Sequence, residues 1–372
     1  MRKPVIKRTK KTQPADKPPV ESEMVPPQRK VRIVSLFSGA GGLEIAACRT
    51  GKVEAIVSTD SNATFLSTVE KNMPTHFPEV RHAAIVSDAR ELKGKTMRDL
   101  LGTAPDIVMG GPPCDDYTSL GKKRGLTGDK GLLIFEFLRL VNELKPKAFV
   151  FENVPNLTRQ FKQGFEQFLT QAGKDGYLTK WHLLKACDFG APTLRTRVFV
   201  VGWQNAILCN AFRFPEATHV NPHDNAIFMQ NGRGLKPYIL ISDVLNGLPD
   251  VNTPQADLYF NHTGRKHRSE TIEQFKNLPE GKSSGRSYRY RAPFFGLTQS
   301  LTAGLDNRTK TYLHPHYHRE MTVREYARIH LFPDSWRFAG TPDNGNKQVA
   351  NSVPIPLGHA VLEAIISTVS AS

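Results

Sequence analysis

The chain has 372 residues, of which 39% are hydrophobic, so it is long enough for two domains and rich enough in apolar residues for a packed core. No apolar run approaches the ~18 residues that a membrane span requires, and we therefore expect a soluble protein. A formal charge of +15 and a pI near 9.7 favour a polyanionic partner. Nucleic acid ranks ahead of a membrane surface, because no basic amphipathic helix stands out.

The cysteines set an expectation about the cellular compartment. No Cys-x-x-Cys pair occurs and no secretory signal precedes the four cysteines, which are Cys48, Cys114, Cys187 and Cys209. The pattern therefore predicts neither a zinc site nor a disulfide framework. A reducing intracellular compartment follows, which is the cytoplasm in a bacterium or the nucleus in a eukaryote.

The first 30 residues differ in composition from the rest of the chain. They carry nine Lys or Arg residues against Asp16, Glu21 and Glu23, together with many prolines. This composition predicts a disordered leader, which is either simply solvated or an arm that contacts DNA. We assign it no catalytic role.

From Val31 onward, short apolar runs alternate with helical stretches. Strands alternating with helices predict an α/β fold, a doubly wound and mainly parallel sheet of the Rossmann-like kind. The predicted strands are VRIVSLF, EAIVSTD, DIVMGG, KAFVFEN, WHLLKA and RVFVVGW.

A second, smaller domain is predicted after Trp203. Residues 205–295 are richer in Asn, Gly, Pro and basic residues and show weak periodicity, whereas helical patterning returns at TVREYARIHLF and IPLGHAVLEAIISTV. We therefore expect a first domain made of residues 31–204 and 296–372, with residues 205–295 inserted into it.

The first predicted strand runs into FSGAGGLEIA, where Gly39, Gly41 and Gly42 predict a tight turn that lets a ligand lie against the backbone. The turn lacks the Gly-Lys-Ser/Thr of a phosphate-binding loop, and its spacing departs from the dinucleotide fingerprint. The second strand ends at Asp60, about 20 residues on, where a carboxylate can accept hydrogen bonds from ribose hydroxyls. Asp88 follows the run AAIV and can contact an adenine amino group. S-adenosylmethionine fits this nucleoside pocket better than a dinucleotide does.

A cysteine follows the strand DIVMGG in the sequence GGPPC. Pro112 and Pro113 restrict the backbone, so that Cys114 is expected to project from the carboxyl edge of the sheet, where ligands bind in open α/β folds. The alternative is that Cys114 packs as a small apolar residue, as free cysteines usually do.

Six motifs occur in an order that resembles the cytosine-C5 DNA methyltransferase family. The resemblance covers roughly residues 31–205 and 298–368, and the gap between these blocks corresponds to the family's target recognition domain. The motifs are FSGAGGL, GGPPC, FENVPNL, APTLRTRVFVVG, MTVREYARIHLFPDSW and NKQVANSVPIPLGHAV.

The resemblance implies methyl transfer from S-adenosylmethionine to carbon 5 of a cytosine flipped out of duplex DNA. Cys114 would attack carbon 6 of the base, and Glu152 would hydrogen bond to N3 and the exocyclic amine. Arg197 would hold O2 of the base, with Arg195 supporting the loop or a phosphate. The cycle would end when a base, such as water, removes the carbon 5 proton and the cysteine leaves.

The same resemblance extends the cofactor pocket beyond the glycine turn and the two aspartates. Asn351 and Val353 would close the pocket and tie the C-terminal segment to the first strand. The remaining members are Phe37, Ser38, Leu43, Gly111, Pro113 and Leu133.

Two basic stretches are expected to contact DNA. The glycine-containing loop after Cys114 carries Lys122, Lys123 and Arg124, which can meet phosphates as the loop closes; a solvated surface loop is the alternative. GRSYRYRAPFF interleaves aromatic and basic residues, and a buried strand with solvated arginines is the alternative there. Its arginines are Arg286, Arg289 and Arg291.

Some positions depart from the family pattern. Asp115 and Asp116 follow the cysteine where the family usually has Gln and another residue, and carboxylates there oppose phosphate binding and tend to raise the pKa of a nearby thiol. Thr193 replaces a usual Gln, and Ser61 replaces a bulky residue that often packs on adenine. These departures affect the expected rate, target and cofactor affinity rather than the reaction class.

Three histidines alternate in HPHYH and would share one face of a strand, which could suggest a metal. The segment resembles the family's approach to the helix that carries Arg324 and Glu325, which we expect to pair within the domain. We therefore predict no metal site. The histidines are His314, His316 and His318.

The sequence thus predicts a monomeric DNA (cytosine-5-)-methyltransferase, with a separate restriction endonuclease as its functional partner by family analogy. Two other readings stay open. One is a tRNA cytosine-C5 methyltransferase of the same superfamily, and the other is a catalytically silent DNA-binding homologue, to which Asp115 and Asp116 lend weight.

Overall fold

The structure, a computed structural model, describes residues 29–113, 132–222, 234–284, 289–302 and 311–371. Its centre is a seven-stranded sheet in the order β3-β2-β1-β4-β5-β7-β6. Only β7 runs antiparallel to its neighbours in this sheet. The strands are β1 (Val31–Leu36), β2 (Val53–Asp60), β3 (Arg81–Val86), β4 (Ile107–Gly110), β5 (Ala148–Asn153), β6 (Leu178–Lys185) and β7 (Thr196–Trp203).

Helices cover both faces of the sheet, which is why its central strands are apolar on both sides. Val31 and Ile33 of β1 belong to one buried cluster, and Val34 and Leu36 belong to the other. On the first face lie α1 (Gly42–Cys48), α2 (Ala63–His76), α7 (Ala206–Ala211) and α13 (Ile355–Ser370). On the second face lie α3 (Gly94–Leu101), α4 (Leu133–Leu144) and α6 (Lys162–Lys174), next to the short α5 (Asn156–Arg159).

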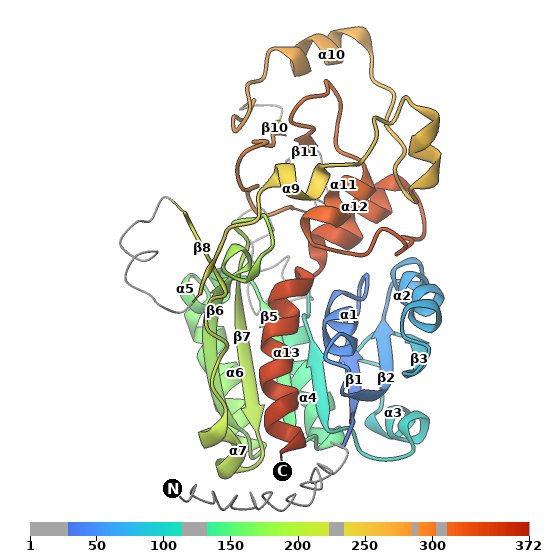
Figure 1. The fold of residues 1–372 in the computed structure, drawn as a ribbon. Helices are drawn as coiled ribbons and strands as arrows, with labels where there is room; N and C mark the ends of the chain where they lie inside the picture. Colours follow the sequence, from blue (N-terminus) through green and yellow to red (C-terminus); the bar gives the residue numbers. More distant parts are fainter. Residues whose placement is uncertain (1–28, 114–131, 223–233, 285–288, 303–310, 372) are drawn as a thin grey trace, which may run out of the picture.

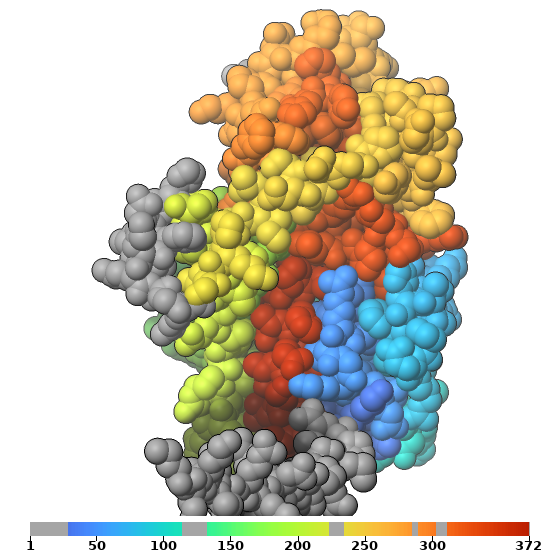
Figure 2. Space-filling view, in the orientation of Figure 1, coloured from blue at the N-terminus to red at the C-terminus, as the bar shows by residue number. Residues whose placement is uncertain are grey.

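The C-terminal helix α13 fills the middle of the first face. It packs against α1, and in the space-filling view it lies between the segment of α1 and the segment of β6 and β7 (Figure 2). The last motif of the chain is therefore part of the same domain as the first strand. Among the described residues no single helix is long and apolar enough to cross a membrane; only α12 and α13, bent by 41° at their junction, meet that length and composition together.

A second group of elements lies beyond the carboxyl ends of the parallel strands (Figure 1). It contains two-stranded pairs of β8 with β9 and of β10 with β11. The elements after α7 are β8 (His219–Val220), β9 (Lys236–Pro237), α9 (Ile241–Leu245), the 3-10 helix η3 (Pro254–Leu258), α10 (Ser269–Lys276), β10 (Arg289–Arg291), β11 (Thr311–Leu313), α11 (Val323–Ile329) and α12 (Pro342–Asn351).

The predicted fold class is confirmed, and all six predicted strands are present. The helical stretches expected near the C-terminus are α11 and α13. The strand β3 was not predicted, because it is an edge strand whose side chains are only partly buried and its apolar run is short. Ile241 of α9 and Leu208 of α7 share a buried cluster with α13, so part of segment 205–295 packs on the core of the sheet.

Candidate active site at the carboxyl edge of the sheet

The glycine turn connects β1 to α1 through an unusual backbone. Phe37, Gly39 and Gly41 have φ values of 58°, 57° and 86°, which lie in the left-handed region that favours glycine. A Cβ on Gly41 would lie 3.0 Å from Cζ2 of Trp336, so neither the conformation nor the space admits a side chain there. A Cβ on Gly39 would meet no described atom within 4 Å, which leaves room above the turn for a ligand.

Asp60 ends β2 and fixes this turn. Its Oδ2 accepts a hydrogen bond of 2.8 Å from the N–H of Gly39, and its Oδ1 accepts one of 2.8 Å from the N–H of Asn62. Burial raises the pKa of the Asp60 carboxyl, while these two hydrogen bonds oppose the shift. The carboxylate is thus oriented at the edge of the sheet where the sequence placed a ribose contact.

Asp88 lies just beyond β3, next to the end of β2, because the N–H of Ser87 donates to the carbonyl of Asp60 at 3.1 Å. The Arg90 side chain binds both carboxylate oxygens of Asp88, at 2.9 and 2.7 Å. Hydrogen bonds from Arg90 lower the pKa of Asp88 to about 2. Asp88 is therefore an ionised acceptor, with its orientation set by Arg90.

The C-terminal segment closes over the start of α1. A Cβ on Gly42 would lie 2.8 Å from the carbonyl oxygen of Val353, so the two backbones are in close contact. Nε1 of Trp336 donates to the carbonyl of Ala40 at 3.2 Å. Val353 is buried beside the turn, as the sequence led us to expect, whereas Asn351 is exposed.

The other expected cofactor residues surround the same edge. Gly111 follows β4, and a Cβ there would lie 2.6 Å from Oε2 of Glu152, so glycine allows the carboxyl to approach the strand end. The amide of Asn153 donates to the carbonyl of Pro112 at 3.2 Å and holds the segment that ends at Pro113. Ser38, Leu43 and Leu133 are buried, and Phe37 is half-buried.

Glu152 and Arg197 form an ion pair at the centre of the site. Glu152 is the last residue but one of β5, with 7% of its surface exposed, and its Oε1 lies 2.9 Å from Nε of Arg197, at the start of β7. Burial raises the pKa of Glu152, and the charges of Arg197 and Arg195 oppose the shift only in part.

Arg195 is a buried support of the loop. Its guanidinium donates to Oγ of Ser300 at 3.3 Å and to the carbonyls of Leu301 and Asn351 at 3.2 and 3.4 Å. These contacts join the motif APTLRTR to the segment before β11 and to the end of α12. Of the two roles considered for Arg195, the geometry favours loop support over phosphate contact.

Several expected site residues lie outside the described residues. They include the candidate nucleophile and the basic loop that follows it: Cys114, Asp115, Asp116, Lys122, Lys123, Arg124 and Arg286. The other three cysteines are buried and free. The part of the site that the structure describes therefore consists of the residues around Gly110, Gly111, Pro112 and Pro113.

The structure corrects the expected DNA contact of Arg291. Arg291 is 4% exposed, and its guanidinium donates to backbone carbonyls of Phe275, Leu278 and residues of the segment after β11. These hydrogen bonds occupy the guanidinium of Arg291, and they join the end of α10 to the segment after β11. Arg289 stays partly exposed, donates to Oε1 of Gln274 at 2.7 Å and lies over the ring of Phe275.

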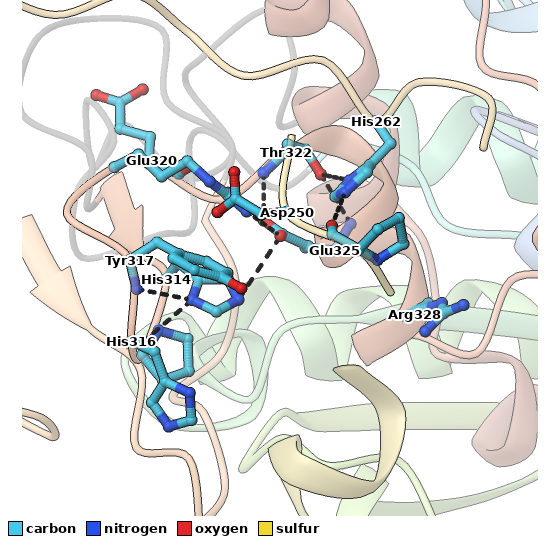
Figure 3. A network of polar contacts seen from close by, with 12 residues as sticks. Asp250, His262, His314, His316, Tyr317, Glu320, Thr322, Glu325 and Arg328 are labelled. Carbon is cyan, nitrogen blue, oxygen red and sulfur yellow. Dashed lines mark hydrogen bonds and ion pairs between the residues drawn. The ribbon is translucent and has the colours of Figure 1, made fainter. Parts of the chain in front are cut away.

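The histidines of HPHYH do not share one strand face, because β11 ends at Leu313. His314 is buried, and its Nδ1 accepts hydrogen bonds of 3.1 Å from the N–H groups of His316 and Tyr317 (Figure 3). Its Nε2 lies 3.7 Å from Oε1 of Glu325, while His316 and His318 are exposed. Within the described part of the chain no group of three His, Cys, Asp or Glu is placed to hold a metal.

Arg324 and Glu325 have the structural roles that we expected. Glu325 accepts two hydrogen bonds from Arg319, at 2.9 and 2.7 Å, and one from the N–H of Thr322, which caps α11. Arg324 is fully buried and donates to the carbonyls of Phe260, Pro333 and Trp336.

Two buried polar residues near the site were missed in the sequence. Glu44 lies in the first turn of α1 with no exposed surface, and His330 lies at the end of α11, where its Nδ1 is 3.2 Å from Oγ of Ser352. An acidic residue directly after a glycine turn, in GGLEIA, was the one available signal for Glu44. Nothing in the sequence around His330 indicated burial.

Comparisons with known proteins agree with this geometry. A family model described as C-5 cytosine-specific DNA methylase matches residues 31–367. Type II methyltransferase M.NgoFVII of Neisseria gonorrhoeae is 30% identical over 87% of this chain and 83% of its own length. Type II methyltransferase M.AquIA of Picosynechococcus is 34% identical over 60% of this chain and 92% of its own length.

Solved structures share the fold. A prophage-encoded E. coli protein assigned as a DNA modification methyltransferase aligns with a TM-score of 0.69 and 24% identity, over 91% of this chain and 99% of that one. The S. pombe Dnmt2 methyltransferase aligns with a TM-score of 0.59 and 16% identity, with the same coverage. With its family motifs gathered at one sheet edge and the family match spanning both parts of the chain, this protein belongs to the C-5 cytosine-specific DNA methylases.

Proposed function

We propose that this DNA methyltransferase transfers a methyl group from S-adenosylmethionine to carbon 5 of a cytosine flipped out of duplex DNA, as the modification enzyme of a type II restriction-modification system. The observation that carries the proposal is the buried Glu152 carboxyl. Its Oε1 forms an ion pair of 2.9 Å with Nε of Arg197, and its Oε2 lies against Gly111 at the strand end that leads into Cys114.

The proposed chemistry begins at Cys114. Carbon 5 of cytosine is a poor nucleophile, and addition of the cysteine sulfur to carbon 6 converts the ring into an enamine that can accept a methyl group at carbon 5. A base, such as water, then removes the carbon 5 proton, and the sulfur leaves as the ring double bond re-forms. The thiolate is the attacking form, so the reaction requires deprotonation of Cys114.

Glu152 would bind the edge of the base during this addition. Its raised pKa favours the protonated carboxyl, which can donate a hydrogen bond to N3 as negative charge develops on the ring. The second oxygen can accept a hydrogen bond from the exocyclic amine. Arg197 lies within reach of the same base and would donate to O2.

The residues of the glycine turn fit the proposed cofactor. S-adenosylmethionine would supply an electrophilic methyl group on a sulfonium. The open space over Gly39 leaves room for the ligand. The oriented Asp60 carboxylate offers an acceptor for the ribose, and the ionised Asp88 offers an acceptor for the adenine amine. Val353 and Trp336 would restrict the pocket from the C-terminal side.

The proposed substrate is duplex DNA, and the target base must leave the helix to reach Glu152. Flipping costs a few kcal/mol, which contacts to the backbone must offset. The excess of 50 basic over 35 acidic residues favours such contacts, and we assign recognition to residues 205–295 and phosphate contacts to Lys122, Lys123, Arg124, Arg286 and Arg289. We further propose that it acts as a monomer in the cytoplasm, with a separate endonuclease that cuts the same site; the names of its bacterial relatives as type II methyltransferases support the restriction-modification setting.

The test is methyl transfer from labelled S-adenosylmethionine to mixed-sequence duplex DNA, with sequencing of 5-methylcytosine. We expect transfer at a defined site and complete loss in Cys114→Ala, with Cys209→Ala as the matched control that stays active. Transfer to tRNA but not to DNA would show that tRNA, rather than DNA, is the substrate. DNA binding without transfer at high enzyme concentration would identify a silent homologue.

A further inference from the structure

Glu44 is a buried acid to which the proposed reaction assigns no role. It lies in the first turn of α1, two residues after Gly42, and none of its surface is exposed. Burying a carboxyl is costly unless hydrogen bonds satisfy it. The positions of these bonds therefore indicate what the side chain does.

The carboxyl of Glu44 joins α1 to the strands beneath it. Its Oε1 accepts a hydrogen bond of 3.3 Å from Oγ of Ser58 on β2, and the same Oγ lies 3.0 Å from Nε2 of His82 on β3. The hydroxyls of Ser35 and Ser38 also lie near the carboxyl and act to lower its pKa, against the effect of burial. Side chains of β1, β2 and β3 thus gather around the Glu44 side chain of α1.

This group of polar side chains lies directly under the cofactor turn. Ser35 and Ser58 are register partners on β1 and β2, and Ser58 precedes Asp60 by two residues, so Ser58 and Asp60 share one face of the strand. Oγ of Ser38 accepts a hydrogen bond of 3.2 Å from the N–H of Thr59 and donates to the carbonyl of Ser35. Ser38 is the residue before Gly39, whose N–H orients Asp60.

The protonation state of Glu44 follows from the same surroundings. Within the described part of the chain Oε2 of Glu44 and Oγ of Ser35 each lack a partner in direct hydrogen-bond geometry, and a proton on Oε2 would supply the missing donor. Burial raises the pKa of Glu44. The titratable groups that face it are uncharged near neutral pH, because burial raises the pKa of the Cys48 thiol and lowers the pKa of His82 to about 4.

We propose that Glu44 is a positioning residue for the cofactor, which acts by holding Ser58 on β2 and thereby keeps the Asp60 carboxylate at the end of that strand, and the Gly39 backbone bound to it, in their binding geometry. The inference rests on the proposed use of S-adenosylmethionine. Glu44 itself would not touch the ligand, because none of its surface is exposed. Its loss is therefore expected to change cofactor affinity rather than the chemistry at cytosine.

The test compares Glu44→Gln and Glu44→Ala with Glu54→Gln, a partly exposed change on the same β2 strand. Cofactor affinity is measured by calorimetry on the full chain, together with thermal unfolding without cofactor. Glu44→Ala should weaken binding by about tenfold or more, the effect of one lost buried hydrogen bond, and leave kcat unchanged at saturating cofactor. Glu44→Gln keeps a neutral donor and acceptor and should bind as the wild type does at neutral pH.

The pH profile separates positioning from general destabilisation. Burial raises the pKa of Glu44, so wild-type affinity should fall as the pH rises through this raised pKa, while the affinity of Glu44→Gln stays level. Equal pH profiles of wild type and Glu44→Gln, or unchanged affinity in a folded Glu44→Ala, would overturn the inference and leave the proposed function intact. Absence of binding by the wild type would overturn both.

Discussion

Glu152 is the residue at which burial and charge oppose each other most directly. Its carboxyl lies near the end of β5 against Gly111, and Arg197 and Arg195 both favour its ionised form. Burial has the larger effect and raises the pKa. In the proposed mechanism a raised pKa favours the protonated carboxyl, which would donate a hydrogen bond to the ring nitrogen of the bound base.

We predict that Glu152→Gln lowers kcat by about 10²–10⁴-fold, the usual contribution of positioned acid catalysis. In the wild type, kcat should fall as the pH rises through the raised pKa of Glu152, and this alkaline decline should disappear in Glu152→Gln. The measurement is single-turnover methyl transfer across the pH range. Glu166→Gln, on the exposed side of α6, is the control that should match the wild type. A Glu152→Gln enzyme of normal rate would remove Glu152 from the mechanism.

At the scale of elements, the site depends on the contact between α1 and the segment before α13. Helix α13 packs along α1, and the backbone of Val353 lies against Gly42. The two motifs at opposite ends of the chain thus form one wall of the proposed cofactor site. Any side chain at position 42 would separate them.

We predict that Gly42→Ala destabilises the fold by about 1–3 kcal/mol, as overpacking commonly does, and weakens cofactor binding. The new Cβ would lie 2.8 Å from a backbone oxygen, which cannot rotate away as a side chain can. Gly173→Ala in α6 is the matched control, because its Cβ would meet nothing within 4 Å. Urea unfolding of both variants measures the difference in the free energy of unfolding. Equal values would show that the backbone at Val353 shifts to accommodate the new Cβ without loss of stability.

At the scale of the whole molecule, a buried polar network links α11 to the elements beyond the sheet. Thr322 caps α11, and its Oγ1 lies 2.9 Å from Nδ1 of His262, whose Nε2 is 2.8 Å from the carbonyl of Pro249. Glu325 accepts hydrogen bonds from Arg319. Its carboxylate also faces His314, as Figure 3 shows. These bonds join the segment after β11 to α11, and α11 packs against α9 and α12.

We predict that Glu325→Gln lowers the free energy of unfolding by about 3–5 kcal/mol at neutral pH, since it leaves the buried Arg319 charge without its partner. The pKa of Glu325 is lowered, chiefly by Arg319 against the effect of burial. Its stabilisation is therefore present above the ordinary glutamate pKa and is lost as the pH falls through the folded pKa. Urea unfolding at several pH values measures both effects, with the exposed Glu270→Gln as control.

His314 should add to this acid sensitivity. Burial lowers its pKa from 6.5 to about 4, so the folded state holds the neutral ring while the unfolded chain takes up a proton. Stability contributed in this way is complete above pH 6.5 and is lost as the pH falls toward about 4. A Glu325→Gln protein as stable as the wild type at every pH would show that the network adds nothing to the fold.

The amino-acid sequence by itself determined the fold class, six of the seven strands of the sheet and the positions of Glu152 and Arg197 in their motifs. Apolar runs and glycine turns are local features, so their spacing along the chain predicts strands and the edge at which they end. β3 escaped prediction because an edge strand needs only a short, half-buried apolar run.

Only the tertiary structure decided which polar side chains are buried and what they bind. Arg291 looked like a DNA contact in its basic stretch, yet segments on either side supply carbonyls that enclose it. The three alternating histidines separate because the strand ends at Leu313. Glu44 became significant only when β1, β2 and β3 were brought under one helix turn. Burial and pKa depend on neighbours far away in the chain, and no local pattern carries that information.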